Sequence, residues 1–519
     1  MSELLLGGGT VHTLDDDRRV AEAVLFRDGR VAAVGDTEAV EAAATDPERI
    51  ELDGRTVLPG FNDAHTHVFS VGIGLLETDL SAADDREEAL DLLAENADAT
   101  PAGEWVLGFQ YDESTWPAGG RDYLTKAELD GVSEDHPIVA VRVDGHSATL
   151  NGRALEAVDF SGVEHDVRTE NGEPTGRVVE DATGRVRAAS YPDVPKAREA
   201  LDAAIDHYHE LGVTSIQTVA GLTRVRDHGY VQQEALFAHW RDDDLDLRTT
   251  FYVPQWQAAS LSDLEIASGF GDDWLRLGGL KTFSDGSIGS ETAKTHREYA
   301  GGGHGEMVND REQLREWFAH AARTNQQIAT HAIGGEAIDV VIDEYERALE
   351  SYDDSFDPRL RIEHAELATD EAIERMADLG IVASMQPNFL QWNGDDGLYE
   401  NRLGSDVRSE NNRYRDVLDA DVPLAFGSDK MPPGPLYGMS FTVESPYESQ
   451  RLTVDEALAA STRGAAYAEF QEDEKGVLEP GRFGDAVVLD LDPYENADSF
   501  DDIEVELTVI DGDVVYDGR

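Results

Sequence analysis

The stretch Asp63-Ala64-His65-Thr66-His67 contains the residues of this chain that are best suited to metal chemistry. It ends the apolar run 57–62, which we expect to be a short buried strand. Because side chains alternate between the two faces of a strand, His65 and His67 should point the same way. Two neutral imidazoles at that spacing can bind one metal ion from one side. Half-buried strands also carry such pairs by chance, so the interpretation depends on further ligands downstream.

Four further candidate ligands follow in order along the chain. Each lies in or ends a short apolar run that is followed by Gly-rich or polar sequence and then by a helical pattern; they are Lys281, His331, His364 and Asp429. A repeated order of strand, ligand, loop and helix is typical of a (β/α)8 barrel, whose active site lies at the C-terminal ends of its strands. The sequence therefore predicts an α/β fold of the TIM-barrel type.

Eight barrel strands can be placed on this pattern. We expect them near Phe61, 213–217, 249–253, 277–283, 328–331, 360–364, 382–386 and 424–428. Residues 70–200 then form a long insertion between the first and second strands. The apolar run 138–143 would make a ninth strand, so we assign it to the insertion. A helix is expected from Val454 to Ala468, with a capping box at Thr453.

Both ends of the chain read as short strands joined by turns. The runs 24–26 and 31–34 flank Arg27-Asp28-Gly29-Arg30, which is a hairpin signal. The runs 486–489, 505–510 and 514–516 have the same character, with a turn at Asp511-Gly512. We therefore expect residues 1–57 and 475–519 to form one small β-domain, a β-sandwich, beside a barrel that comprises residues 58–474.

Acidic residues dominate the composition and give a formal net charge of −65 over 519 residues. They occur in short runs, such as Asp15-Asp16-Asp17, between which the apolar pattern persists, so they indicate a solvated surface and not a disordered tail. Such a surface repels itself at low salt and is screened at molar salt. We infer a halophilic source, and we expect neither nucleic acid nor anionic membranes as partners.

The chain contains no cysteine, which excludes disulfides and thiolate ligands. No apolar run approaches the roughly 18 residues that span a bilayer. The first nine residues lack the basic region and apolar core of a signal peptide. We expect a cytoplasmic protein that acts on a small-molecule substrate, with a homodimer left open as its assembly.

The whole set of motifs resembles the amidohydrolase superfamily, and within it the amidohydrolase 3 branch, which includes N-substituted formamide deformylases. The likeness covers nearly the full length. The motifs that carry it are Pro-Gly-Phe-Asn-Asp-Ala-His-Thr-His (59–67), Trp-Pro (116–117), Arg-Val-Asp-Gly-His (142–146), Lys-Thr-Phe-Ser-Asp-Gly-Ser-Ile-Gly-Ser (281–290), His-Ala-Ile-Gly (331–334), Arg-Ile-Glu-His (361–364), Gln-Pro (386–387), Phe-Gly-Ser-Asp (426–429) and Gly-Asp-Ala-Val-Val-Leu-Asp (484–490).

This resemblance implies a binuclear metal centre. Its ligands would be His65, His67, Lys281, His331, His364 and Asp429, with Lys281 carboxylated by CO2 so that it bridges two divalent ions. Imidazole and carboxylate ligands without sulfur favour zinc, with manganese or iron as alternatives. Two other interpretations stay open. Lys281 could be a buried lysine paired with Asp285 or Glu291, or a single ion could be held by His65, His67, His331 and Asp429.

The resemblance also implies a mechanism. A hydroxide that bridges the metals attacks a carbonyl-type carbon, and Asp429 accepts the proton and passes it to the leaving nitrogen. Relatives place the cluster 142–146 over the site, which implies that Arg142, Asp144 and His146 contact substrate, with hydrogen bonding within the loop as the alternative. Trp116 is a candidate for the pocket wall, with ordinary packing in a core as the alternative. The chain departs from the usual family pattern at Gly335-Glu336 and at Gln217-Thr218, which affects the pocket and not the expected ligands.

The leading functional prediction is a hydrolase that cleaves amide-type C–N bonds, of the N-formyl or N-acyl amine class. A cyclic-amide hydrolase or a deaminase of the same superfamily is the alternative, because these enzymes share the metal centre and differ in the pocket. A non-catalytic binding or regulatory protein is disfavoured, because every expected type of ligand is present.

Overall fold

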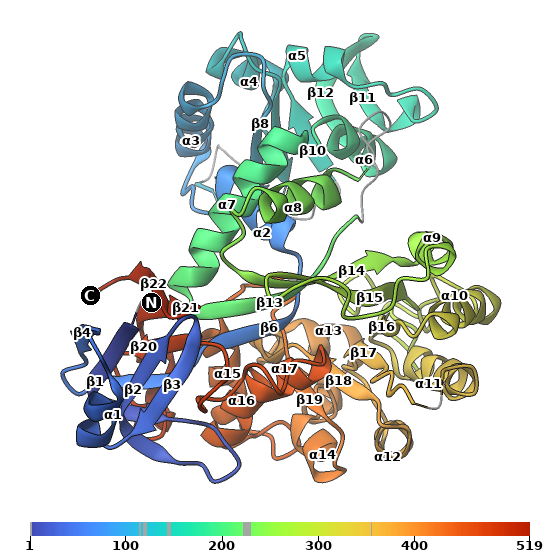
Figure 1. The fold of residues 1–519 in the computed structure, drawn as a ribbon. Coiled ribbons are helices and arrows are strands. Elements are labelled where there is room, and N and C mark those ends of the chain that lie inside the picture. Colours follow the sequence, from blue (N-terminus) through green and yellow to red (C-terminus); the bar gives the residue numbers. More distant parts are fainter. Residues whose placement is uncertain (1–2, 114–115, 118–121, 143–146, 222–229, 354) are drawn as a thin grey trace. The chain divides into compact units, whose positions relative to one another are not determined.

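The computed structural model describes residues 3–113, 116–117, 122–142, 147–221, 230–353 and 355–519 (Figure 1). The chain divides into two compact units. Unit 1 comprises residues 1–68, 205–222 and 236–519, and unit 2 comprises residues 69–204 and 223–235. The bounds predicted above for the β-domain, the barrel and the insertion stay a prediction.

Unit 1 contains an eight-stranded parallel sheet that forms the barrel. Its neighbours run in the order β19-β18-β17-β16-β15-β14-β13-β6. The backbone N–H of Asp429 donates a hydrogen bond of 2.7 Å to the carbonyl of His65, which brings the first and last strands together. All eight predicted strands are confirmed: β6 (Phe61–Thr66), β13 (Val213–Val219), β14 (Arg248–Pro254), β15 (Leu275–Phe283), β16 (Gln327–Ala332), β17 (Arg361–His364), β18 (Val382–Met385) and β19 (Leu424–Phe426).

Amphipathic helices follow the strands, as the strand–helix alternation predicts. In α11 (Gly335–Leu349) the buried residues Ile338, Val341, Ile342 and Tyr345 recur at helical spacing. The Tyr345 hydroxyl donates to the carbonyl of Arg361 at 2.7 Å, which ties this helix to β17. Other helices of unit 1 are α9 (Ala258–Asp263), α10 (Arg311–Arg323), α12 (Asp370–Leu379), α13 (Leu398–Leu403), α14 (Tyr414–Asp419) and α15 (Pro435–Val443).

The prediction of a single helix from Val454 to Ala468 is wrong, because this segment forms two helices. These are α16 (Val454–Ala460) and α17 (Arg463–Ala468). Thr462 leaves the helical region with φ −130° and ψ −92°. The carbonyl of Ser461 instead accepts a 2.8 Å hydrogen bond from the N–H of Asn62 in β6, so a tertiary contact replaces the helical one. The capping box at Thr453 is confirmed.

Strands from both ends of the chain join in one mixed sheet, in the order β22-β21-β20-β5-β1-β2-β3, with β4 paired to β1. Positive φ values at Asp28 (51°) and Gly29 (78°) form the predicted hairpin turn. The strands are β1 (Glu3–His12), β2 (Val20–Arg27), β3 (Arg30–Gly35), β4 (Glu48–Glu51), β5 (Thr56–Pro59), β20 (Ala486–Leu489), β21 (Val505–Ile510) and β22 (Asp513–Asp517), and α1 (Thr37–Ala43) follows β3.

Unit 2 is built on a six-stranded mixed sheet in the order β11-β12-β10-β9-β8-β7. The run assigned to the insertion forms β9 (Ile138–Arg142) of this sheet and no barrel strand, as predicted. The other strands are β7 (Thr78–Asp79), β8 (Val106–Tyr111), β10 (Ser147–Leu150), β11 (Val167–Glu170) and β12 (Glu173–Val179). Its helices include α3 (Arg86–Ala99), α4 (Lys126–Val132), α5 (Gly152–Ala157) and α6 (Glu180–Ala189).

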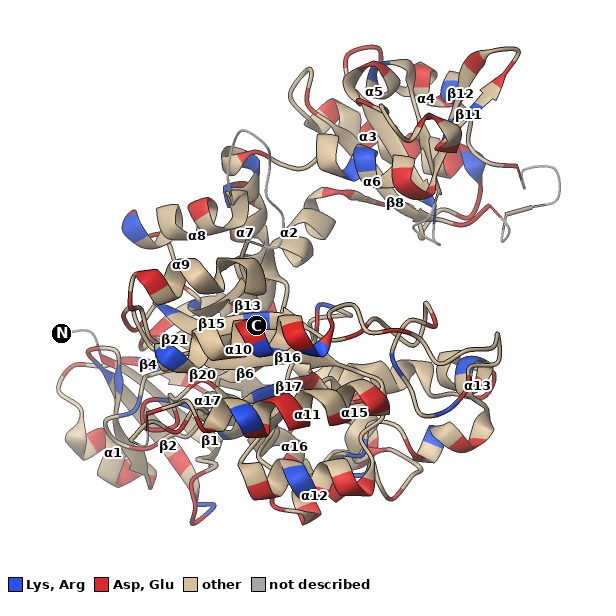
Figure 2. Cartoon of the chain, turned by 90° about the vertical axis from the view of Figure 1, so that its right-hand side faces the viewer, with Lys and Arg blue, Asp and Glu red and all other residues tan. Residues whose placement is uncertain are grey.

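Three further helices, α2 (Val68–Leu76), α7 (Val194–Glu210) and α8 (Val231–Arg241), contain residues of both units. Acidic residues occur on the helices and loops of each unit, with far fewer basic residues between them (Figure 2). Within the described part of the chain, no helix has the length and apolarity needed to cross a membrane.

Candidate metal centre

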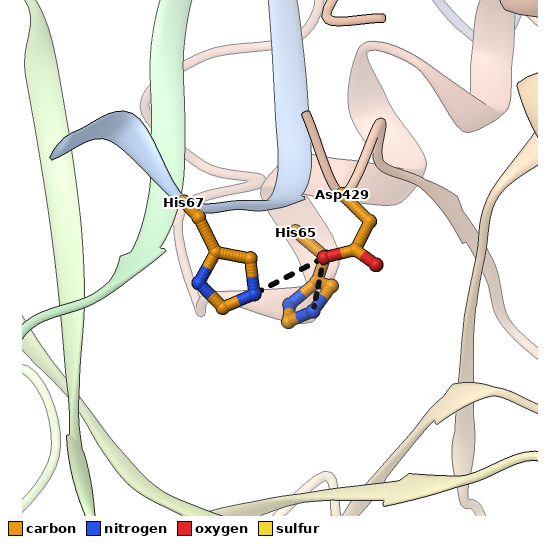
Figure 3. A group of neighbouring side chains, drawn as sticks. All are labelled: His65, His67 and Asp429. Atoms are coloured by element: carbon orange, nitrogen blue, oxygen red, sulfur yellow. Dashed lines mark ion pairs between the residues drawn. The ribbon is translucent and has the colours of Figure 1, made fainter. Parts of the chain in front are cut away.

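His65, His67 and Asp429 meet at the C-terminal end of the barrel strands. His65 lies in β6, His67 follows it directly, and Asp429 follows β19. The Oδ1 atom of Asp429 is 3.1 Å from Nε2 of His67 and 3.7 Å from Nε2 of His65. Figure 3 shows both imidazoles turned toward this one oxygen. The predicted common direction of the two histidines is therefore present.

The spacing of these three side chains suits a single ion. Their ligand atoms all lie within 4.8 Å of one another. Two ligands bound at about 2.1 Å to one tetrahedral ion are about 3.4 Å apart, and the two measured distances bracket that value. The set consists of two imidazoles and a carboxylate, which are ligands that zinc and other divalent metals accept. It can hold one divalent metal ion.

Lys281 lies in β15, fully buried, beside this group. Its Nζ is 3.4 Å from Nε2 of His65. Burial lowers the pKa of the Lys281 amine to about 8, against the opposing charges of Glu363 and Asp429. Asp285 and Glu291, the alternative partners considered for Lys281, bind other groups. Asp285 accepts the backbone N–H groups of residues 294, 333 and 334, and Glu291 forms an ion pair with Arg402 at 3.1 Å.

His331 and His364 stand next to each other on β16 and β17. Their ring centroids are 4.5 Å apart, and His364 is 5.3 Å from the ring of His65. Nε2 of His331 donates to the carbonyl of Gly286 at 3.0 Å, and Nδ1 of His364 donates to Oε1 of Gln386 at 2.7 Å. Each hydrogen bond fixes one ring nitrogen as the donor and leaves the other with a free lone pair, as metal-binding histidines require.

Burial disfavours the charged form of three imidazoles of the site, those of His65, His331 and His364. Burial, followed by the charge of Lys281, lowers the pKa of His331 to about 4 and that of His65 far below its usual value. The pKa of His364 is also lowered, by burial and then by the charge of His331. A neutral imidazole is the form that binds metal. The four predicted histidines, Lys281 and Asp429 are thus brought together at one end of the barrel.

Asp429 stays ionised in this setting. Burial alone raises its pKa, but the hydrogen bond from His67 and the charge of Lys281 lower the pKa to about 2. Its backbone adopts a φ of 49°, which is sparsely populated by residues other than Gly, Asn and Asp. This conformation turns the carboxylate toward His67 at the point where the strand ends.

Several side chains that support the ligands are absent from the sequence prediction. Glu363 places Oε2 3.3 Å from Nδ1 of His65. Gln386 orients His364, and Asp63 accepts the N–H groups of His65 at 3.1 Å and Ser428 at 2.9 Å. Each belongs to a motif that contains or adjoins a ligand. Their position at strand ends was the available signal, but sequence alone does not show which neighbour each one contacts.

Gly427 permits the close approach of β19 to β6. A Cβ atom at this position would lie 2.4 Å from the backbone nitrogen of His65 and 2.9 Å from its Cα. Side-chain carbons do not approach backbone atoms so closely, so any other residue must push the two strands apart. Asp429 and His65 belong to these two chain segments, and their separation sets the geometry of the site.

Gly427→Ala should therefore lower turnover by about 100-fold, the effect of displacing reacting groups by about 1 Å. The measurement is kcat, together with bound metal by elemental analysis. Gly74→Ala in α2 is the matched control, because nothing lies within 4 Å of a Cβ at that position. Normal turnover of the Gly427→Ala protein would show that the strand spacing does not control the site.

The structure describes two of the four predicted substrate contacts, Trp116 and Arg142. Trp116 packs in the core of unit 2, where its Nε1 donates to the carbonyl of Ala83 at 3.2 Å. Arg142 ends β9 and forms an ion pair of 3.0 Å with Glu113. Asp144 and His146 lie outside the described residues. Contact of these four residues with substrate stays a prediction.

Comparison with known proteins supports the features above. The family model described as "Amidohydrolase family" (Amidohydro_3) matches residues 48–516. Protein LONG AFTER FAR-RED 3 of Arabidopsis thaliana is 29% identical over 99% of this chain and 92% of its own length. The N-substituted formamide deformylase of Arthrobacter pascens is 28% identical over 100% of this chain and 99% of its own length.

A solved structure agrees with the fold at similar coverage. It is described as an uncharacterized metal-dependent hydrolase from Pyrococcus furiosus, is 26% identical, and superposes with a TM-score of 0.80 over 95% of this chain and 100% of that one. The family match extends over far more than half of the sequence and includes all six predicted ligands. The chain belongs to the amidohydrolase family and is a hydrolase that acts on carbon–nitrogen bonds.

Proposed function

We propose that this protein is a metal-dependent hydrolase of amide-type C–N bonds, and that its substrates are N-formyl or other N-acyl amines. The observation that carries the proposal is the convergence of His65, His67 and Asp429 within 4.8 Å at the end of the barrel. The N-substituted formamide deformylase, aligned over both full chains, supports the choice of substrate class.

We assign the metal ligands to the six residues of the sequence prediction. His65 and His67 would hold one ion, His331 and His364 would hold the second, and Lys281 and Asp429 would complete the centre. Divalent ions bound there would polarise the carbonyl of the substrate and supply a nucleophile at neutral pH. The absence of sulfur favours zinc, and manganese and iron also accept imidazole and carboxylate ligands.

The setting of Lys281 supports its carboxylation. Addition of CO2 needs the neutral amine, and burial favours that form by lowering the pKa of Lys281 to about 8. The Nζ lone pair would form a bond to the carbon of CO2, and one amine proton would be released to solvent. The product is an anionic carbamate whose two oxygens would suit a bridge between two cations. A protonated lysine 3.4 Å from a metal-binding nitrogen of His65 would instead repel the ion.

Asp429 is the general base of the proposed reaction. An ionised carboxylate at this position can accept a proton from the attacking water. It then delivers this proton to the leaving nitrogen. The hydrogen bond between the Asp429 N–H and the His65 carbonyl fixes the backbone from which the carboxylate projects.

Removal of the metal should abolish activity. A variant that lacks a metal ligand should not regain activity when metal is added back. We expect the chelated protein to regain hydrolysis of N-formyl and N-acyl amines when zinc is added in high salt. His67→Asn should bind zinc more than about 100-fold more weakly, because loss of a direct ligand exceeds the effect of losing an outer partner. The measurements are a zinc titration and a substrate panel.

His165→Asn is the matched control for this test. It replaces a histidine whose side chain is 71% exposed in unit 2, far along the chain from any proposed ligand. This variant should bind zinc and hydrolyse the panel as wild type does. Full activity of the chelated wild-type protein, or of His67→Asn without bound metal, would refute the proposed function.

A further inference from the structure

Arg361 connects several strands in the interior of the barrel. The residue is fully buried in β17. Its guanidinium donates to the carbonyl of Ala64 in β6 at 2.7 Å, to the Tyr252 hydroxyl in β14 at 2.8 Å and to the Ser384 hydroxyl in β18 at 2.9 Å. It also donates to Oε1 of Gln217 in β13. One cation thus holds together the strands around His65.

Glu363 lies two residues further along the same strand and is also fully buried. Its Oε1 is 3.0 Å from Nε of Arg361. Its Oε2 accepts a 3.3 Å hydrogen bond from Nη2 of Arg361 and lies 3.3 Å from Nδ1 of His65. The carboxylate therefore stands between the guanidinium and the imidazole.

This order has a chemical consequence for His65. An ionised carboxylate can only accept a hydrogen bond, so the proton of the neutral His65 imidazole belongs on Nδ1, next to Glu363. The lone pair then lies on Nε2, the nitrogen that faces Asp429. A carboxylate buried without a partner would be costly, and Arg361 supplies the compensating charge. Arg361 also fixes the backbone next to His65 through the Ala64 carbonyl.

We propose that Arg361 and Glu363 form a positioning pair that sets the tautomer and orientation of His65 as a metal ligand. Glu363 acts on the ring, and Arg361 acts on Glu363 and on the β6 backbone. Both residues are fully buried in the barrel. The proposal rests on the metal centre proposed above and adds to it the residues that determine how tightly His65 binds.

A second buried ion pair in the barrel provides the matched comparison. Glu469 is as deeply buried as Glu363 and pairs with Lys475 at 2.8 Å. Its partners include Asn62 at 2.6 Å and the Thr250 hydroxyl. Removing the charge of Glu363 or that of Glu469 should destabilise the fold to a similar degree. Of these two carboxylates, only Glu363 contacts a proposed metal ligand.

The experiment compares Glu363→Gln with Glu469→Gln after loading with Co2+ in high salt. We expect Glu363→Gln to bind Co2+ about 10- to 100-fold more weakly than wild type, and its visible absorption bands to shift. Glu469→Gln should lose comparable thermal stability while its Co2+ affinity and absorption stay unchanged. A merely structural role of Glu363 would move stability and leave the spectrum alone.

Wild-type affinity and absorption in Glu363→Gln would overturn the proposal. Should this variant fail to fold, Glu363→Asp decides in its place, because it keeps the charge next to Arg361 and shortens the reach toward His65. It should show weaker binding and shifted bands in the same direction, and wild-type values for it would overturn the proposal. Failure of the wild-type protein to bind Co2+ at all would refute the metal centre itself and is thus distinguishable.

Discussion

Replacing Lys281 with Ala should abolish hydrolysis and lower the metal content from two ions per chain to one or none. In the proposed centre the carboxylated side chain would supply the bridging anion that offsets the repulsion between two cations about 3.5 Å apart. Without it the second site loses a ligand and the two charges are no longer compensated. We expect kcat to fall by about a thousandfold or more, since the groups of such a site act as a unit.

The measurements are bound metal by elemental analysis and kcat on the best substrate of the panel. Short-chain carboxylic acids should restore part of the activity of Lys281→Ala by occupying the bridging position. Lys196→Ala is the matched control, because Lys196 is a partly exposed lysine of unit 2 that pairs with Glu199. Wild-type protein that is fully active with one bound metal and an unmodified Lys281 would establish the mononuclear mechanism instead.

The fold should also depend on salt. The net charge of −65 is carried by carboxylates that are largely exposed, such as Asp395 and Asp473, whose side chains are more than nine-tenths exposed. Their mutual repulsion reaches about 10 Å at 0.1 M salt and about 3 Å at 1 M salt. We therefore expect Tm to rise steeply with KCl between about 0.05 and 3 M, and the folded state to be lost at the low end.

Circular dichroism across this range is the test, and an equal series in sucrose separates charge screening from a general stabilising effect of cosolutes. A Tm that does not change with KCl would contradict the expectation. The inference of a halophilic source rests on the same net charge and stays a prediction. The homodimer also stays a prediction.

The barrel was predictable because its signals are local. Each strand is a short apolar run. Lys281, His331 and His364 lie in strands, and Asp429 follows shortly after the end of β19. Parallel strands of a closed barrel bring their C-terminal ends to one face, so the ligands had to converge once the strands were placed. Resemblance to a family then added the roles of the individual ligands.

Other features were not predictable, because they depend on contacts between distant segments. The interruption of the helix at Ser461 and Thr462 arises from a hydrogen bond with Asn62, more than 390 residues earlier in the chain. The contacts of Glu363 with His65 and of Gln386 with His364 cross between strands. A sequence pattern predicts the face of a strand on which a side chain lies. It does not predict which partner a buried polar side chain will contact on that face.

Trp116 illustrates a related difficulty. An aromatic residue beside Pro in an irregular segment suits a pocket wall and a packed core equally well. In the structure its ring lies in the core of unit 2, with Tyr111 stacked at 5.9 Å. Burial inside a unit is a property of the folded chain, and the local sequence around Trp116 does not encode it.

Crystals grown in high salt with zinc offer the most direct measurement, namely anomalous diffraction at the zinc absorption edge. The proposed centre predicts an anomalous peak within about 2.3 Å of Nε2 of His65, Nε2 of His67 and a carboxylate oxygen of Asp429. A second peak is predicted beside His331 and His364, with density for a carboxylated Lys281 between the two. Catalytically active crystals without a peak at His65, His67 and Asp429, or with zinc bound only elsewhere, would contradict the proposed metal-dependent hydrolase.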